Sequence, residues 1–348
     1  MRCEDVYVAG VGSYYPSLRP VEDAIRDGHY DAASQRRTHQ QSVAVAGGRP
    51  GEDQPDMAVR AGRTALHRGG LATDEVGLLL HAVAVYAGLD GWNCASYLQD
   101  RLLDGGGLAF EIRQVSNGAV GALELAVPFM QARATGSAAL ITASERFAPP
   151  VWNRWRADAG LIFGDGASAL LLSRRKGFAK LLSVATESAS ELEGLHRGEA
   201  PFQSGPDPAA FPLNLAARAV SFVDEMGSEK IHEIGAQKLR RAGERAAADA
   251  GMTLAETTAY AVPNFGRSLL ERQVLEPLDA PLERTTHDWG ARTGHVGAAD
   301  QFGGFDHLVN EGRVGPGDRV MLVGVGGGFN YTCAVIEILR RPGWGDKL

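Results

Sequence analysis

The sequence predicts a layered α/β fold built from two similar halves. Short apolar runs typical of buried strands alternate with longer segments of helical pattern, which indicates sheets covered by helices on their faces. Each half also closes on a glycine-rich strand pattern, IFGDGASALLL at residues 162–172 and LVGVGGGFNYTCAVIE at residues 322–337. We therefore expect a duplicated αβαβα arrangement in which the two halves meet at the centre.

The expected strands are short aliphatic runs bounded by glycine or polar residues, and the expected helices have wider apolar spacing over longer stretches. Pro128 falls inside one expected helix and should kink or shorten it, because proline lacks the N–H that a helix interior needs. In chain order, the strands are expected at residues 6–11, 76–85, 138–142, 167–172, 258–262 and 320–325, and the helices at residues 56–66, 117–133, 213–225 and 229–250.

The boundary between the halves is expected near residue 173, where the polar segment SRRKG follows the first glycine-rich strand. This divides the chain into residues 1–172 and residues 173–348. The start of the helix at residues 117–133 would then lie against loops of the second half.

Composition excludes several classes of protein. The chain has 348 residues, of which 44% are hydrophobic and 22% charged, as is ordinary for a globular protein. A net charge of −7 gives no reason to expect nucleic-acid binding, and no apolar run is long enough to span a membrane. The N-terminus has no signal-peptide core, and the three cysteines have no metal-ligand spacing. We therefore expect a cytoplasmic protein without a metal site.

Ser116 is the first candidate for chemistry. It lies in QVSNGAVGALELAV, where its hydroxyl would meet the start of a helix rich in small residues. Negative charge that develops there is stabilised by unpaired backbone N–H groups and by the helix macrodipole. The alternative is a purely structural serine that caps the helix.

A serine nucleophile needs a base, because its hydroxyl is too weakly acidic to react unaided. His295 lies in ARTGHVGAADQFGG, and a turn entering a helix would bring Asp300 back to its imidazole and complete a Ser–His–Asp relay. The alternative is a turn histidine beside a capping residue. His196, in GLHRGEAP, lies in a polar loop and is the weaker candidate for a site role.

The run Gly326–Gly328 is too compact for a dinucleotide-binding fingerprint, and a strand pattern rather than a helix follows it. Two interpretations remain open. The backbone approaches a reacting carbonyl closely, or the glycines form a bulge between two strands.

Taken together, these segments resemble the β-ketoacyl-acyl carrier protein synthase III group of the thiolase superfamily over nearly the whole chain. The resemblance implies a thiolase fold with five-layered αβαβα subunits, a homodimer, and an acyl-enzyme made from acyl-coenzyme A, which is a substrate and not a cofactor. The matching segments, in order, are VAGVGSYYP, residues 111–127, IFGDGASALLL, AYAVPNFGR, TGHVGAADQ and VGPGDRVMLVGVGGGFNYTCAVIE.

The resemblance also implies roles for single residues. The nucleophilic cysteine of the family falls on Ser116, its active-site histidine on Asn264 and its active-site asparagine on His295. Gly327 takes the place of the oxyanion-hole glycine, with the Ser116 N–H as the second donor. Trp92, in LDGWNCAS, matches the aromatic residue that closes the acyl pocket of the partner subunit.

Contacts to coenzyme A and to a carrier protein are implied less directly. Arg154 and Arg156 lie close to where the family contacts coenzyme A, whereas its adenine-binding tryptophan–arginine motif is absent and Arg36 and Arg37 stand in that region. An acidic carrier protein needs a basic patch, although basic residues on helices are often simply solvated. The candidates for this patch are Lys230, Lys238, Arg240, Arg241 and Arg267.

The departures from the family pattern indicate a branch of it. Serine in place of cysteine, with a histidine relocated beside Asp300, resembles the starter-unit enzymes of daunorubicin/aclacinomycin type and the related acyltransferases of antibiotic polyketide pathways. A deliberate replacement of cysteine by serine is the alternative, but His295 with Asp300 favours a site built for an oxygen nucleophile.

We therefore predict an enzyme that takes a short acyl group, propionyl by resemblance, from acyl-coenzyme A onto Ser116. It would condense this group with malonyl-acyl carrier protein or transfer it to the carrier as a polyketide starter unit. Two alternatives remain: an O-acyltransferase acting on a sugar or a late antibiotic intermediate, and a catalytically silent specificity partner in a synthase complex.

Overall fold

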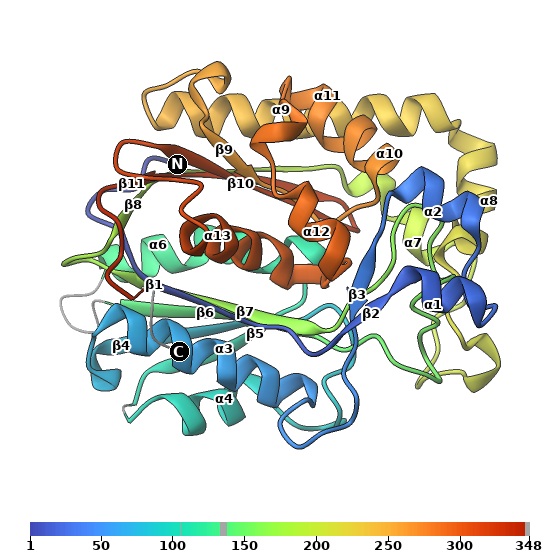
Figure 1. The fold of residues 1–348 in the computed structure, drawn as a ribbon, viewed down its shortest axis with the longest axis horizontal. Helices are drawn as coiled ribbons and strands as arrows, with labels where there is room; N and C mark the ends of the chain where they lie inside the picture. The colour runs from blue at the N-terminus through green and yellow to red at the C-terminus, as the bar shows by residue number, and fades with distance from the viewer. Residues whose placement is uncertain (105, 133–137, 345–348) are drawn as a thin grey trace.

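The helices and strands stack in five alternating layers (Figure 1). The computed structural model describes residues 1–104, 106–132 and 138–344. The expected αβαβα architecture is confirmed. One sheet is covered on its outer face by α9 (Ser228–Asp249), the other by α3 (Gln54–Gly69) and α4 (Cys94–Leu102), and the layer between the sheets holds α6 (Leu123–Ala132) and α13 (Asp300–Asn310).

The strands pair in the order β5-β4-β6-β7-β1-β8-β11-β10-β9. β1 and β8 share only two paired positions, so the ladder divides there into a wing of five strands and a wing of four, which are the two sheet layers of Figure 1. The strands are β1 (Tyr7–Tyr14), β4 (Val76–Ala82), β5 (Leu108–Ile112), β6 (Ala138–Glu145), β7 (Gly166–Ser173), β8 (Ala179–Ser188), β9 (Ala259–Ala261), β10 (Arg319–Gly326) and β11 (Asn330–Ile338).

The central layer binds the wings together. β6 and β7 are buried at every position, because α3 covers one of their faces and the central helices cover the other. Leu123 and Val127 of α6 and Phe302 and Phe305 of α13 are fully buried in this central core. Burial of such side chains is worth about 1.5–3 kcal/mol each, so the layer contributes strongly to holding the wings in register.

Every strand expected from the sequence is present, and three of the four expected helices appear as α3, α8 (Leu215–Met226) and α9. The expected helix at residues 117–133 is divided into a 3₁₀ turn η2 (Val115–Asn117), α5 (Gly118–Gly121) and α6. Pro128 lies inside α6, so the interruption falls upstream of the proline. Residue 133 of this expected helix lies outside the described residues.

The remaining elements are short. A two-stranded sheet joins β2 (Leu18–Pro20) to β3 (Ser42–Ala44). Among the described residues, no helix is long and apolar enough to cross a bilayer. The short helices are α1 (Val21–Arg26), α2 (Ala32–Thr38), α7 (Gly194–Arg197), α10 (Arg267–Leu270), α11 (Glu276–Leu278) and α12 (His287–Thr293), with a π-helical segment η6 (Glu271–Leu275) between α10 and α11.

Candidate active site

Ser116 lies in the η2 turn, which leads into α5 and α6 between the two sheets. The preceding residue, Val115, has φ 47, a left-handed conformation that is strained for a β-branched side chain. Asn117 anchors the other side of the turn by donating to Gln114 Oε1 at 2.7 Å and to Thr332 Oγ1 of β11 at 2.9 Å. The turn therefore holds the Ser116 hydroxyl in one fixed position.

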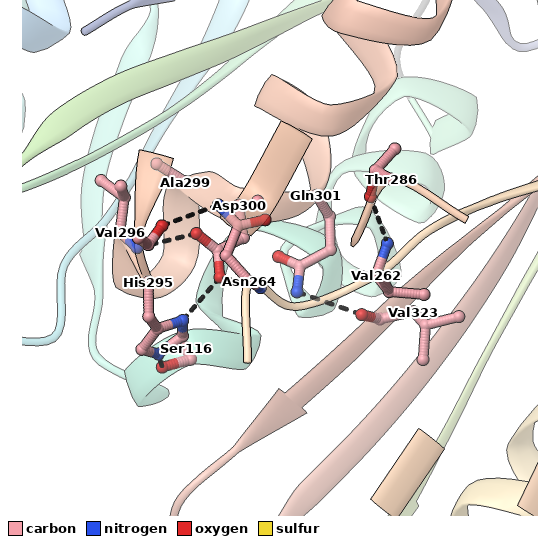
Figure 2. Close-up of polar contacts among 12 residues, drawn as sticks. Ser116, Val262, Asn264, Thr286, His295, Val296, Ala299, Asp300, Gln301 and Val323 are labelled. Carbon is pink, nitrogen blue, oxygen red and sulfur yellow. Dashed lines mark hydrogen bonds and ion pairs between the residues drawn. The ribbon is translucent and has the colours of Figure 1, made fainter. Parts of the chain in front are cut away.

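His295 is the hydrogen-bond partner of Ser116. Its Nε2 lies 2.8 Å from Ser116 Oγ, and Figure 2 shows the imidazole between the serine and Asp300. A hydrogen bond joins the backbone of His295 to the first half of the chain, because its N–H donates to the Ile162 carbonyl at 2.8 Å. The side chain is only 3% exposed, and the rings of Phe163 and Phe265 pack against it.

Asp300 completes the chain of hydrogen bonds. It begins α13, and its Oδ2 accepts the Nδ1–H of His295 at 2.5 Å. The backbone N–H groups of Asn264 and Val296 donate to the same carboxylate, each at 2.8 Å. These bonds compensate a fully buried charge and orient the imidazole so that its Nε2 accepts the Ser116 proton.

A tight turn makes this geometry possible. Gly297, between His295 and Asp300, has φ +54 and lies against Glu145, so that a Cβ there would come within 2.8 Å of Glu145 Cγ. Only glycine fits such a position without strain. The five-residue spacing from His295 to Asp300 thus becomes one turn that returns the carboxylate to the imidazole.

Ser116 and His295 open into a cavity of about 290 Å³, which we call the nucleophile pocket. Its volume is close to the lower end of the range for small-molecule sites. Its wall is largely apolar and aromatic. The pocket is lined by Ala84, Val85, Val115, Ser116, Phe147, Trp152, Asp158, Leu161, Phe163, Leu195, His196, Leu215, Ala216, Ala219, Phe265, Leu269, Gln273, His295, Val325, Gly327 and Phe329.

Comparison with known proteins shows the family to which this chain belongs. The model of 3-oxoacyl-[acyl-carrier-protein (ACP)] synthase III matches residues 110–190, and the model of the C-terminal part of that family matches residues 247–338. The solved structure of the acyltransferase ChlB3 is 34% identical, with a TM-score of 0.91, over 97% of this chain and 99% of that one. The chain belongs to the 3-oxoacyl-[acyl-carrier-protein] synthase III family.

More distant relatives have the same length. The β-ketoacyl-[acyl-carrier-protein] synthase III of Rhizorhabdus wittichii is 27% identical over 337 residues, covering 95% of this chain and 98% of its own. The enzyme of that name from Clostridium beijerinckii is 22% identical over 335 residues, covering 96% and 99%. The 3-oxoacyl-(acyl carrier protein) synthase III of Pseudomonas aeruginosa shares the fold, with a TM-score of 0.76 at 21% identity over 97% and 99% of the two chains. This chain is therefore a transferase of the ketosynthase type.

Asn264 is not among the described residues that line the nucleophile pocket. It is 2% exposed, and its side-chain amide donates to the Gly294 carbonyl at 2.8 Å instead of facing the nucleophile pocket. Its Oδ1 is directed at Gly290 and has no hydrogen-bond partner among the described residues. Asn264 thus contributes its backbone N–H, which holds Asp300, and not its side chain.

The two arginines expected to bind coenzyme A differ in this structure: Arg154 is paired inside the fold, whereas Arg156 is exposed and its expected contact stays a prediction. Arg154 is buried and forms a double hydrogen bond with Asp165, at 3.0 and 2.9 Å, so its charge is neutralised inside the fold. Arg156 donates to the carbonyls of Gly28 and His29 and does not line the nucleophile pocket. The expectation for Arg154 is wrong, because its guanidinium is buried and its charge is already paired with Asp165 inside the fold.

Trp92 packs against Tyr97 and lines a second cavity, of about 670 Å³, which borders the nucleophile pocket at Val85 and Trp152. Its expected contact with a partner subunit stays a prediction.

The basic residues expected to bind a carrier protein are partly paired with acidic neighbours. Arg240 is paired with Glu244 and Asp279, and Arg267 with Glu271. Lys230 and Arg241 are exposed and Lys238 is half-buried.

Sequence reasoning missed Glu145 and the aromatic wall. Glu145 is fully buried at the end of β6, where it accepts the N–H groups of Ala84 at 2.6 Å and Val85 at 3.2 Å. Burial raises the pKa of Glu145 to about 8, against the effect of these donors. Phe163 and Phe265 lie in the IFGDG and VPNFGR segments, and the distinctive patterns of these segments could have indicated that their aromatic residues belong to the site.

The three cysteines offer no alternative nucleophile. Cys3, Cys94 and Cys333 are free and buried, and burial raises the pKa of each thiol to about 12. None of them lines the nucleophile pocket in the part of the chain that the structure describes. All three cysteines are thus buried small side chains.

Proposed function

We propose that this protein is an acyltransferase that carries a short acyl group on Ser116 and moves it from acyl-coenzyme A to the thiol of an acyl carrier protein. The observation that supports this most is the continuous chain of hydrogen bonds from Ser116 through His295 to Asp300 at the wall of an apolar pocket. A catalytically silent partner would have no need of a buried carboxylate aimed at that imidazole.

In the first half-reaction, His295 Nε2 takes the Ser116 proton while Oγ attacks the thioester carbon. The Gly327 and Ser116 N–H groups would stabilise the oxyanion, since Gly327 lines the same pocket. When the C–S bond breaks, the imidazolium returns its proton to the leaving sulfur. Coenzyme A departs as the free thiol, and the acyl group remains on oxygen.

In the second half-reaction, His295 takes the proton of the acceptor thiol as the sulfur attacks the ester carbon. The C–Oγ bond then breaks, and the proton passes to Ser116. The overall exchange of one thioester for another is balanced in free energy, so no external driving step is required.

The position of Asn264 favours transfer over condensation. Decarboxylation of a malonyl unit develops negative charge on its thioester oxygen, which needs fixed hydrogen-bond donors. The Asn264 amide donates to the Gly294 carbonyl, and Asn264 is not among the described residues that line the nucleophile pocket. This arrangement supports transfer as the reaction.

Product analysis tests this function. The acyl-enzyme formed with propionyl-coenzyme A is isolated and offered a carrier protein bearing a free thiol, a malonyl-carrier protein, or a hydroxylated sugar acceptor. We expect acyl-carrier protein from the first and no β-ketoacyl product from the second. A β-ketoacyl product would establish condensation, and an acylated hydroxyl in place of acyl-carrier protein would establish O-acyl transfer.

A further inference from the structure

His196 is a polar group of the nucleophile pocket that the steps above do not use. It lies on α7 and lines the pocket together with Ser116 and His295. Burial lowers the pKa of His196, Asp158 opposes this shift and Arg218 adds to it, so the ring is neutral near pH 7. No side-chain hydrogen bond from a described residue contributes to its environment.

The ring of His196 lies against Gly327, the residue expected in the oxyanion hole. A Cβ on Gly327 would come within 2.2 Å of His196 Nδ1, so the imidazole packs directly on the backbone expected to donate to the oxyanion. The ring of Phe329, 5.2 Å away between centroids, holds it from a second side. An acyl group on Ser116 would therefore pass within a few atoms of this imidazole.

The other hydroxyl, imidazole, carboxylate and amide side chains that line the pocket among the described residues are accounted for. Ser116 and His295 bond each other, Asp158 accepts the Gly160 N–H at 2.7 Å, and Gln273 is exposed on the π-helical segment η6. A purely aliphatic acyl group would cover the imidazole of His196 without offering it a partner. Leaving a buried polar group unpaired is unfavourable, and sites with such groups discriminate strongly against analogues that lack the matching atom.

We propose that His196 is a specificity-determining residue that hydrogen-bonds a hydroxyl or keto oxygen on carbon 2 or carbon 3 of the acyl group. This inference rests on the proposed role of Ser116 as the acyl carrier. A neutral imidazole both donates and accepts, which suits a hydroxyl. A carboxylate at that position is disfavoured, because the carboxylate of Asp158 lines the same pocket.

Paired substrates test the proposal. The rate of Ser116 acylation is measured by rapid-quench mass spectrometry with lactoyl- against propionyl-coenzyme A, and with 3-hydroxybutyryl- against butyryl-coenzyme A. We expect the wild-type enzyme to prefer the hydroxylated member of at least one pair by tenfold or more. In His196→Leu the ratio should fall to near one, and His196→Gln should restore part of it.

Each ratio is taken within one enzyme preparation, so a variant that folds less well does not change it. His232→Leu is the matched control, since His232 lies on α9 and lines a neighbouring cavity, and its ratios should equal those of the wild type. Wild-type ratios near one for both pairs, or a preference that survives His196→Leu, would overturn the proposal.

A binding measurement separates this proposal from the proposed function. In Ser116→Ala no acyl-enzyme forms, and calorimetry reports the dissociation constants of the same four thioesters. A preference for the hydroxylated thioesters that depends on His196 supports the inference even if the wild type is not acylated. Equal affinities refute the inference and leave acyl transfer through Ser116 untouched.

Discussion

At the scale of single residues, the proposed mechanism gives an alcohol the role that a thiolate has in enzymes with a cysteine nucleophile. A serine hydroxyl has no reactive anion near neutral pH, so it needs a base in contact with it. His295 meets this need at 2.8 Å, and Asp300, bonded to two backbone N–H groups, keeps the imidazole in the tautomer that accepts the proton.

We expect His295→Ala to slow acylation of Ser116 by about 10²–10⁴-fold, the usual contribution of a general base. The measurement is the rate of acyl-enzyme formation with saturating propionyl-coenzyme A, followed by intact-protein mass spectrometry. His29→Ala changes an exposed histidine and should leave the rate unchanged. An unaltered rate in His295→Ala, with the fold intact by circular dichroism, would remove this imidazole from the mechanism.

The sequence predicts the part of the site that is local and misses the part that is not. His295 and Asp300 are five residues apart with glycine between them, so one turn relates them. The rotamer of Asn264 depends on Gly290 and Gly294, some thirty residues further along the chain, which no local pattern reveals. The buried pair of Arg154 with Asp165 is likewise fixed by tertiary packing.

At the scale of elements, the end of β6 organises the wall of the nucleophile pocket. Glu145 binds the backbone of Ala84 and Val85, which line the pocket, and packs on Gly297 in the turn that carries His295. The same carboxyl thus links β6, the segment after β4 and the turn between His295 and Asp300. Its protonation state should therefore affect the stability of the whole assembly.

The pKa of Glu145 is raised from 4.5 to about 8, so this group stabilises the folded state fully below about pH 4.5. That contribution is lost as pH rises through about 8, and it amounts to at most about 5 kcal/mol. Glu145→Gln cannot ionise. We expect its melting temperature, relative to wild type, to increase steadily between pH 5 and pH 8, as measured by calorimetry.

Glu191→Gln changes an exposed carboxyl and serves as the control, with a difference from wild type that does not vary with pH. If the difference between Glu145→Gln and wild type stayed constant over this range, the carboxyl of Glu145 would not titrate there.

The predictability of the elements follows from their burial. β6 and β7 are buried at every position and contain the apolar runs AALI and ALLL, so their sequences indicate strands directly. β5 reads LAFEI at an edge of the ladder and is half exposed, and β8 mixes polar and apolar residues along its length. Neither has a pattern that separates a strand from a loop in a single sequence.

At the scale of the whole molecule, the ladder ends in an uncovered apolar edge. Among the described residues β5 pairs with β4 alone, and its Leu108 and Phe110 are 39% and 51% exposed. An unprotected edge strand with exposed large side chains is a template for pairing with another chain. We propose that β5 of a second copy pairs here to form the expected homodimer.

Phe110→Lys should convert this dimer to a monomer, because it places a charge in the apolar centre of the proposed interface. Sedimentation velocity at micromolar concentration measures the change. Phe202→Lys is the matched control, since Phe202 is 95% exposed on a loop remote from β5 in sequence, and it should leave the mass unchanged. A monomeric wild-type protein, or a dimer that persists in Phe110→Lys, would contradict this arrangement.

The claim on which the rest depends is that Ser116 carries the acyl group, and peptide mapping tests it directly. Cleavage after Arg113 and Arg133 releases residues 114–133, a peptide in which Ser116 is the only hydroxyl and in which there is no cysteine or lysine. After incubation with acyl-coenzyme A, we predict the acyl mass on this peptide of the wild-type protein and its absence from Ser116→Ala. An acyl group found on another peptide, or no acylation by any of the thioesters named above, would contradict the claim.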